Sequence, residues 1–392
     1  MSEATVLERE RAIARYLSGE SATAICQSVG RSREWLYKWV KRHATGDTQW
    51  AEERSRRPQQ SPRRVTSDLE AVIVATRRSL AQRQLFCGAQ AIAWELGTLK
   101  RPAPSLRSIS RVLDRHALVT RQRGPYVAKG VAYPTLQAAR AGHVHQTDFV
   151  GPCYVRGPFR FYSLHSVDLA TGRCGVQRVA NRSSQPTLDG LWAIWRRLGI
   201  PDHQQVDNEM VFYGSRAHPR GMGPLIRLCL ASQVEPWFIP PAEPWRNGVV
   251  EKFNHIWGQL GPLGRDVSSL ATLDDGNRAF EERHNAHYRY GVQYSKLGGR
   301  TPNATLAASA VRLRFPATAT APRHPLPKPD SGRYHLVRFV RTDGHLDVFG
   351  EAFRVPDEAV YSYVRATVDV GRQDLTIVMD GRVIDHHRYV MR

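Results

Sequence analysis

The stretch HVHQTDFVGP at residues 143–152 marks the point where the sequence changes from a helical to a strand-like pattern. It is followed by FRFYSLHSVDL (159–169) and GRCGVQRVA (172–180), and glycine and proline residues separate the three runs. Apolar and aromatic runs bounded by such turn formers are typical of β-strands. The stretch therefore predicts three consecutive strands joined by turns.

Helical and strand-like patterns alternate after these strands. Helices are predicted at 187–198, 222–232 and 243–260, and short strands at 203–206 and 234–239. Three hairpin strands followed by alternating helices and strands indicate a mixed α/β fold. We expect this central domain to span residues 140–305.

The first 50 residues predict short helices, the third of which is RSREWLYKWVKRH (31–43). Its Leu36, Trp39 and Val40 recur at helical spacing and can face a core. Five basic residues lie off that stripe: Arg31, Arg33, Lys38, Lys41 and Arg42. Taken alone, this face fits a helix that enters the major groove of DNA and a solvated basic surface equally well.

The pattern recurs after a basic linker at 51–66. A second helical set at 67–125 ends in a helix whose apolar stripe is Ile109, Val112 and Leu113. On another face, basic residues recur every four positions, at Arg107, Arg111 and Arg115. The recurrence favours two tandem DNA-binding modules, a helix-turn-helix domain at 1–50 and a second helix-turn-helix or winged-helix-like domain at 67–125.

The last part of the sequence is proline-rich and then strand-like. Residues 312–330 predict an extended linker, and 331–392 alternate in short runs divided by turns at Asp343-Gly344 and Asp380-Gly381. This pattern predicts a separate small β-barrel. The expected fold class is thus multidomain, with helical helix-turn-helix modules, a central α/β core and an all-β C-terminal domain.

Charge points to a polyanionic partner. The 392 residues include 56 Lys and Arg against 36 Asp and Glu, a formal net charge of +20, and about 24 basic against about 12 acidic residues lie before residue 131. Nucleic acid is the expected ligand. Five widely spaced cysteines without a zinc pattern, and the lack of an apolar run of roughly 20 residues, predict a cytoplasmic protein associated with the nucleoid when bound to DNA.

Three carboxylates stand where the pattern places side chains at the rim of a sheet. Asp148 lies in an apolar and aromatic strand where a charge needs a cation or a partner, Asp207 ends a short strand, and Glu251 lies one helical turn after Asn247. Each also fits a turn former, a loop residue or a solvated helix face. Spacing does not choose among these and their neighbours Asp168, Asp189, Asp202, Glu209 and Glu243.

A resemblance makes that choice. HQTDF, VDNEM and PPAEPWRNGVVEKFNHIW (240–257) resemble the three blocks of the DDE transposase and retroviral integrase superfamily, in its bacterial insertion-sequence form. The third block is the most specific, with Asn247-Gly248, Glu251, Lys252 and Phe253, and HNAHYRYGVQYSKLGGRTP (284–302) resembles the closing segment. The helical modules and the C-terminal barrel resemble the arrangement in phage Mu transposase.

The resemblance implies an RNase H-like core that cleaves and joins DNA. Asp148, Asp207 and Glu251 would hold two Mg²⁺ or Mn²⁺ ions, with Asp148 bridging both. Water and then a freed 3′-hydroxyl would attack double-stranded DNA, first at element ends and then at the target. Other residues could contact the flanking phosphates: Arg246, Asn247, Lys252 and Arg300.

Partners and rival functions also follow from the resemblance. Joining two element ends requires a homo-oligomer assembled on DNA, and the likeness to phage Mu transposase leaves open an ATPase that selects the target. The interval between Asp207 and Glu251 is long, so residues 214–223 are expected to form an inserted loop. Two alternatives remain at this stage, a domesticated DNA-binding regulator without catalysis and a nuclease that does not join ends.

Overall fold

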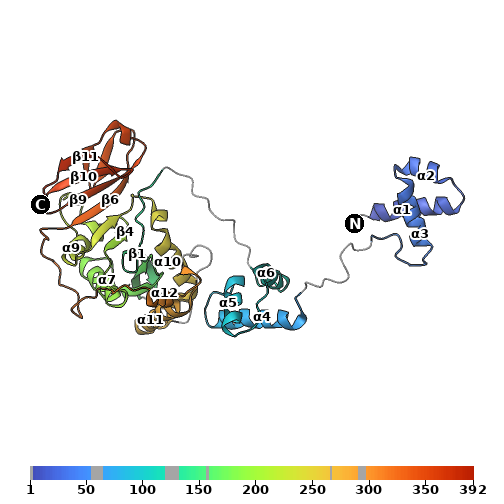
Figure 1. The fold of residues 1–392 in the computed structure, drawn as a ribbon, viewed down its shortest axis with the longest axis horizontal. Helices are drawn as coiled ribbons and strands as arrows, with labels where there is room; N and C mark the ends of the chain where they lie inside the picture. The colour runs from blue at the N-terminus through green and yellow to red at the C-terminus, as the bar shows by residue number, and fades with distance from the viewer. Residues whose placement is uncertain (1–2, 54–64, 120–131, 156–158, 265–266, 290–296) are drawn as a thin grey trace. The chain divides into compact units, whose positions relative to one another are not determined.

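The chain divides into two compact units. A computed structural model describes residues 3–53, 65–119, 132–155, 159–264, 267–289 and 297–392. Residues 1–65 form the first unit, and residues 66–392 form the second (Figure 1). Among the described residues, no helix is both long and apolar enough to cross a membrane.

The first unit is a three-helix module built from α1 (Glu3–Leu17), α2 (Ala22–Val29) and α3 (Arg33–His43). Ser21 and Ser32 cap the second and third helices, because each side chain accepts a hydrogen bond from a free first-turn amide. The predicted stripe of the third helix is confirmed, since Leu36 and Trp39 are fully buried. This small core orients α3.

The second helical module opens the second unit. It contains α4 (Ser67–Gln82), α5 (Ala89–Thr98) and α6 (Leu106–Arg115). Ile109, Val112 and Leu113 are buried, as the periodicity predicts. The described part of this module is helical throughout, and the end of the range expected for it, 120–125, lies outside the described residues.

The core is a mixed sheet whose strand order places the first strand in the middle. Its first half runs β3 (Cys174–Val179), β2 (Arg160–Asp168), β1 (Val144–Tyr154), β4 (His203–Val206) and β5 (Glu235–Phe238). The first three strands are antiparallel, whereas β4 and β5 run parallel to β1. The predicted fold class, with helical N-terminal modules, an α/β core and a β-rich C-terminal region, is confirmed.

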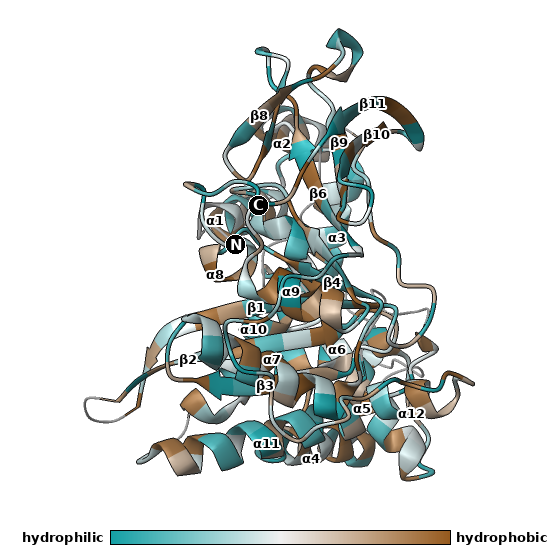
Figure 2. Ribbon diagram, turned by 90° about the vertical axis from the view of Figure 1, so that its left-hand side faces the viewer, coloured by the Kyte–Doolittle hydropathy of each residue, from teal (hydrophilic) through white to brown (hydrophobic). Residues whose placement is uncertain are grey.

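Helices cover both faces of this sheet. On β2, Leu164 belongs to an apolar cluster that includes residues of α7 (Ser184–Leu198) and α9 (Pro224–Ala231), while its neighbour His165 contacts α10 (Gly248–Leu260). Gly190 lets α7 approach closely, because an added Cβ would lie 2.7 Å from Val179 Cγ1. The ribbon of α11 (Leu270–His287) alternates between hydrophilic and hydrophobic residues (Figure 2), as a helix with one buried face must.

The C-terminal region is β-rich, as predicted, but it continues the core sheet instead of standing apart. Strand β6 (Arg333–Phe339) pairs with β5, and β9 (Tyr363–Asp369), β10 (Asp374–Met379) and β11 (Arg382–Arg388) follow it outward. One apolar core spans both parts. The predicted Asp380-Gly381 turn joins β10 to β11, with both residues at positive φ.

The proline-rich segment 312–330 is pinned to the core. The indole of Trp192 donates to Thr318 O, and His324 N donates to the side chain of Gln185, so two residues of α7 hold it. Because backbone groups of this segment are hydrogen-bonded to the core, the segment restricts motion of the C-terminal region relative to the core. Alternating hydropathy could not reveal these contacts.

The inserted loop at 214–223 provides a second set of contacts with the C-terminal region. Arg216 pairs with Asp347, and Arg220 pairs with Glu351, which brings the loop to the hairpin of β7 (His345–Val348) and β8 (Glu351–Arg354). The hydroxyl of Tyr389 donates to Pro219 O at 2.9 Å. The loop therefore has a structural role in the described chain.

The separation into two units predicts that they unfold independently. Trp39→Ala should remove roughly 3–5 kcal/mol from the small core of the first unit, because the ring is fully buried and Arg9 stacks 3.9 Å from its centre. Limited proteolysis should then digest residues 1–65 while the second unit stays intact. Tyr37→Ala, at an exposed aromatic of the same helix, is the control; loss of the second unit's melting transition in Trp39→Ala would contradict independence.

Candidate active site

Strand register places two of the candidate carboxylates on one face of the sheet. Gln146 on β1 pairs with Gln205 on β4, and Asp148 and Asp207 each lie two residues farther along. Because side chains alternate between faces, both aspartates point to the face that carries Gln146 and Gln205. Asp148 is also paired with His165 on β2, whose ring contacts α10. Asp148 therefore lies on β1 under that helix, and Asp207 directly follows the adjacent strand β4.

A layer of side-chain amides seats the helix that carries Glu251. The Gln146 side chain accepts hydrogen bonds from Val249 N and Val250 N at 3.1 and 3.2 Å, which satisfies two amides at the helix start. Asn247 donates to Thr147 O and accepts from Gln205. These contacts fix where α10 begins and so place Glu251, in its first turn, near enough to Asp148 for its charge to raise the pKa of that carboxyl.

Asp148 is held from two directions. One carboxylate oxygen accepts from Phe149 N and the other from the Asn254 amide, both at 2.8 Å. The Asn254 carbonyl lies 2.7 Å from His165 Nδ1, and His165 Nε2 lies 2.8 Å from the Ser163 hydroxyl. Burial lowers the pKa of His165 to about 4, so this histidine is neutral and fits a donor at Nδ1 and an acceptor at Nε2. The chain of bonds orients Asp148.

The three carboxyl groups resist ionisation. Burial raises the pKa of Asp207 to about 7, and the charges of Asp148 and Glu209 add to the effect. Burial raises the pKa of Asp148 to about 6 against its two hydrogen bonds, with further contributions from Glu251 and Glu209. Burial also raises the pKa of Glu251. Mutual repulsion among desolvated carboxylates is the condition that a bound cation relieves.

The five competing acids have hydrogen-bond or ion-pair partners of their own. Asp168 accepts hydrogen bonds from the backbone of Gly142, Ala170 and Thr171, as a turn former does. The others are partnered as well: Asp189 with Gln185, Asp202 with Arg140, Glu209 with Arg182, and Glu243 with Arg246 and Tyr363. These partners distinguish the five acids from Asp148, Asp207 and Glu251, although Glu209 lies near enough for its charge to raise the pKa of both aspartates.

The donor set fits hard divalent ions. All three candidate ligands are carboxylates, and oxygen donors suit Mg²⁺ or Mn²⁺ better than zinc. Among the described residues, the group of three whose ligand atoms all lie within 4.8 Å of one another is His203, Glu235 and His335, which does not include the acidic triad. A two-ion site spreads its ligands around metals about 3.5–4 Å apart, so this spread is compatible with it.

The chain is similar to one family model and to several solved structures. The family model of a homeodomain-like domain matches residues 3–51. The HTLV-2 integrase catalytic core domain, solved with magnesium, is 17% identical over 43% of this chain and 99% of its own, with a TM-score of 0.34. The intasome of simian T-cell lymphotropic virus with PP2A regulatory subunit B56 gamma is 15% identical over 80% of this chain and 99% of its own, with a TM-score of 0.38. The BIV integrase catalytic core domain is 17% identical over 42% of this chain and 94% of its own, with a TM-score of 0.30.

At such identities and TM-scores these likenesses carry no argument. The chain's own features are Asp148 and Asp207 toward one face of the sheet, Glu251 in the first turn of the helix that packs against β1 and β2, and the homeodomain-like N-terminus. They are the features that the resemblance to integrases and transposases predicts. A helix-turn-helix region followed by such a core favours a protein that binds DNA.

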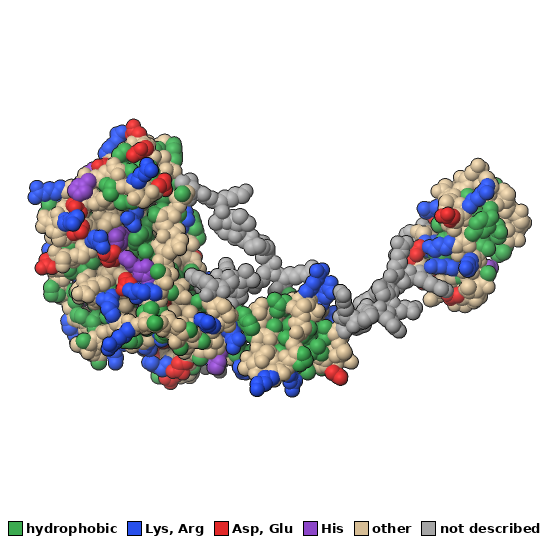
Figure 3. Space-filling model, viewed as in Figure 1, with side chains coloured by type: hydrophobic (Ala, Val, Ile, Leu, Met, Phe, Trp, Pro, Cys, Tyr) green, Lys and Arg blue, Asp and Glu red, His purple; other side chains and the backbone are tan. Residues whose placement is uncertain are grey.

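The predicted DNA-binding residues of the two helical modules lie mainly at the surface. Arg33, Lys38 and Lys41 are exposed on α3, and Arg31 is exposed just before it, whereas Arg42 donates to Glu52 O and stacks over Trp39. On α6, Arg107, Arg111 and Arg115 are exposed, and Arg115 pairs with Glu70. Figure 3 shows Lys and Arg side chains on the visible face of each unit. Their contact with DNA stays a prediction.

The predicted phosphate contacts near the active site divide into two groups. Lys252 and Arg300 are exposed. Arg246 pairs with Glu243 and stacks 3.9 Å from the ring centre of Tyr133. The expectation that Asn247 contacts phosphate is not met, because the residue is only 2% exposed. Its side chain donates to Thr147 O and accepts from Gln205. It positions the helix start.

Sequence reasoning missed Asn254, His165 and Arg338. Asn254 carried a signal, since it lies three residues after Glu251 and shares its helix face. Arg338 carried none, because it comes from β6 in the C-terminal region. Its buried guanidinium donates to Asn208 Oδ1 at 2.9 Å, next to Asp207, and to Ile239 O at 3.2 Å. A cavity of about 420 Å³ adjoins these residues and Asp207.

The raised pKa of Asp207 predicts a stability cost at neutral pH. Its carboxyl binds a proton more tightly in the folded state, at about 7, than at the ordinary value of 3.8. The stabilisation is therefore present below about pH 4 and is lost as pH rises through about 7. Without divalent metal, Asp207→Asn should melt about 2–4 °C above wild type at pH 8, for a gain of about 1 kcal/mol, and at the same temperature at pH 4.

Differential scanning calorimetry at both pH values checks this expectation. Millimolar Mg²⁺ should close the gap at pH 8, because it binds only the wild-type folded state. Asp189→Asn, an acid that accepts from Gln185, should change neither value. A variant that is less stable than wild type at pH 8 without metal would show that Asp207 is not under electrostatic strain.

Proposed function

We propose that this chain is a metal-dependent DNA transposase that cleaves the 3′ ends of its element and joins them to target DNA. The observation that carries the proposal is the set Asp148, Asp207 and Glu251: the two aspartates point to one sheet face, Glu251 lies on the helix that packs there, and all three carboxyl groups resist ionisation. Two Mg²⁺ or Mn²⁺ ions held there would activate the attacking oxygen and stabilise the leaving one.

The chain's own residues prepare this site before DNA arrives. Asn254 and Phe149 N fix both oxygens of Asp148, and Gln146 fixes the first turn of the helix that carries Glu251. Preorganised ligands cost little rearrangement when the substrate binds. Transfer between water, phosphate and a 3′-hydroxyl needs no covalent enzyme intermediate, so no side-chain nucleophile is assigned.

The helical modules supply the DNA binding in this proposal. The homeodomain-like module at residues 3–51 exposes the basic residues of α3, which suits reading of a terminal repeat in the major groove. Two element ends must be held together for joining, so the active form would be a homo-oligomer assembled on DNA. Because all three positions carry carboxylates, we favour a catalytic role over a purely regulatory one.

Removing single carboxylates should separate chemistry from binding. Purified wild type, Asp148→Asn, Asp207→Asn and Glu251→Gln are incubated with pre-cleaved element-end DNA and a plasmid target, with Mg²⁺ or EDTA. Each variant should lose at least about 10³-fold of strand transfer, because a missing ligand leaves charge in the transition state unstabilised. Affinity for end DNA should stay within about threefold, since the basic modules supply it.

Asp189→Asn controls for loss of an acid far from the site. Strand transfer retained by any of the three variants would overturn the site assignment. Specific binding of end DNA by wild type without cutting or joining under Mg²⁺ or Mn²⁺ would instead establish the regulator. Cutting without joined products would establish the nuclease.

Gly248 offers a second test, because this fold does not require a glycine there. Its φ is −61°, and an added Cβ would meet nothing within 4 Å. Gly248→Ala should therefore fold normally and gain roughly 0.5–1 kcal/mol of stability. Strand transfer should nevertheless fall about tenfold or more if DNA approaches the helix start closely, since small displacements of reacting groups are costly.

Gly258→Ala is the matched control, as it lies on the same helix and is equally open. Equal strand-transfer rates for the two alanine variants would argue against close approach of DNA at Gly248. Thermal melting of both variants verifies that folding is preserved.

A further inference from the structure

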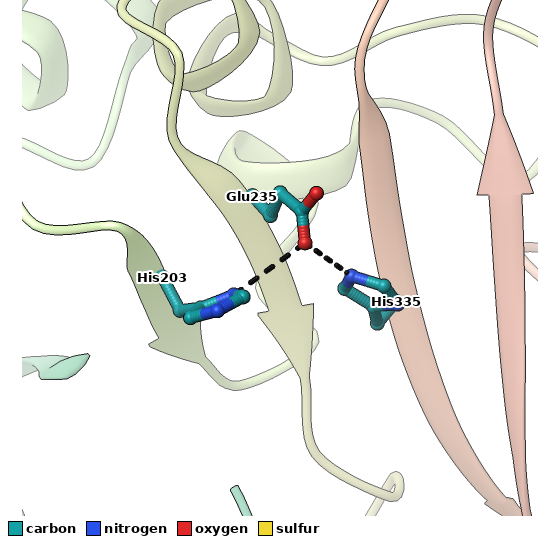
Figure 4. A group of neighbouring side chains, drawn as sticks. All are labelled: His203, Glu235 and His335. Atoms are coloured by element: carbon teal, nitrogen blue, oxygen red, sulfur yellow. Dashed lines mark hydrogen bonds and ion pairs between the residues drawn. The ribbon is translucent and has the colours of Figure 1, made fainter. Parts of the chain in front are cut away.

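A second cluster of potential metal ligands lies at the other end of β4. His203 opens β4, Glu235 opens β5 and His335 belongs to β6, and Figure 4 shows the three side chains pointing toward one another across neighbouring strands. His203 is paired with Glu235 in the sheet register. His203 and Asp207 are four residues apart, roughly 13 Å along the strand direction. The cluster is therefore distinct from the carboxylate site.

One carboxylate oxygen faces two imidazole nitrogens. Glu235 Oε2 lies 2.9 Å from His335 Nε2 and 3.6 Å from His203 Nδ1. His203 Nδ1 is itself buried and has no hydrogen-bond partner. A proton on His335 would satisfy the first contact and leave His203 unpaired. A cation among the three atoms would satisfy all of them.

The ionisation states suit metal ligands. Burial lowers the pKa values of His203 and His335, which keeps both imidazoles neutral at pH 7. Burial alone would raise the pKa of Glu235, but contacts with His335 and Arg333 outweigh it and lower the pKa to about 2. Neutral imidazole and ionised carboxylate are the forms that bind metal.

Neighbouring residues orient two of the three ligands. The Thr367 hydroxyl lies 2.9 Å from His335 Nδ1, which fixes the ring and leaves Nε2 directed at the cluster. Arg333 donates to Glu235 Oε1 at 3.0 Å and leaves Oε2 for the cluster. The positive charges of Arg333 and Arg365 help to keep His335 neutral.

We propose that His203, Glu235 and His335 bind one transition-metal ion, which the donor set identifies as Zn²⁺. Two histidines and one glutamate are a zinc ligand set that leaves a fourth position free. An adjoining cavity of about 510 Å³, lined also by His143 and Trp237, gives that position access to solvent or a small ligand.

The ion would fasten the C-terminal region to the core. Pairing between β5 and β6 comprises two residue pairs, Trp237 with His335 and Phe238 with Leu336. The metal would bridge β4, β5 and β6 at that narrow joint. Because β6 also carries Arg338, which bonds Asn208 beside Asp207, the bridge would stabilise the strand that supports the catalytic loop. The proposal itself does not depend on transposition.

Cobalt titration of the metal-stripped, full-length protein tests the site. Co²⁺ should bind wild type with one equivalent giving visible absorption of a tetrahedral complex, and Zn²⁺ should displace it. His203→Asn, Glu235→Gln and His335→Asn should each weaken binding at least about tenfold. His345→Asn, at an exposed histidine of the β7–β8 hairpin, should bind as wild type does. Zn²⁺ should raise the melting temperature of wild type and of His345→Asn, but not of the three ligand variants.

The controls separate misfolding from loss of a ligand and one metal site from the other. His203→Asn is the decisive variant, because its Nδ1 makes no hydrogen bond whose loss would disturb the fold. Asp207→Asn should keep the cobalt signal, which shows that it does not arise from the carboxylate site. Absence of a tetrahedral cobalt signal in wild type, or equal affinity in His203→Asn, would overturn the proposal.

Discussion

The pairing of β1 with β4 is the constraint on which the candidate site depends. It is a short parallel ladder in which Gln146 and Gln205 lie side by side. This register fixes the face of the sheet to which Asp148 and Asp207, two residues farther along, point. A slip of one residue would send Asp148 or Asp207 to the opposite face, into the buried layer under α7 where Gln204 bonds Thr147 and Trp195. The buried interior on that face makes such a slip prohibitive, so hydrophobic packing secures the geometry of the acids.

The same polar layer explains how a helix distant in sequence presents the third carboxylate. Gln146 satisfies the first amides of α10, and Asn247 and Gln205 join the layer just before the helix begins. Buried amides with complete hydrogen bonding specify one arrangement, because any shift would leave donors unsatisfied. Asn254 then links the helix back to Asp148 and to the neutral His165.

The C-terminal region belongs to the same structural unit as the core. Its first strand extends the sheet, the segment 312–330 is tied to α7, and the inserted loop at 214–223 forms ion pairs with the β7–β8 hairpin. Arg338 then reaches from β6 to the loop after β4. A substitution in the C-terminal region can therefore alter the candidate site even where the substituted residue does not contact DNA.

The sequence by itself determined the order of helices and strands, the apolar stripes of α3 and α6, and the candidate acids, because periodicity and motif are local properties. It also placed the strand His203–Val206, whose last three residues are buried. Only the tertiary structure decided that Asn247 is buried, that Glu243 and Asp202 are occupied by arginines, and that β6 joins the core sheet. These facts depend on contacts between residues far apart in the chain, which hydropathy patterns do not encode.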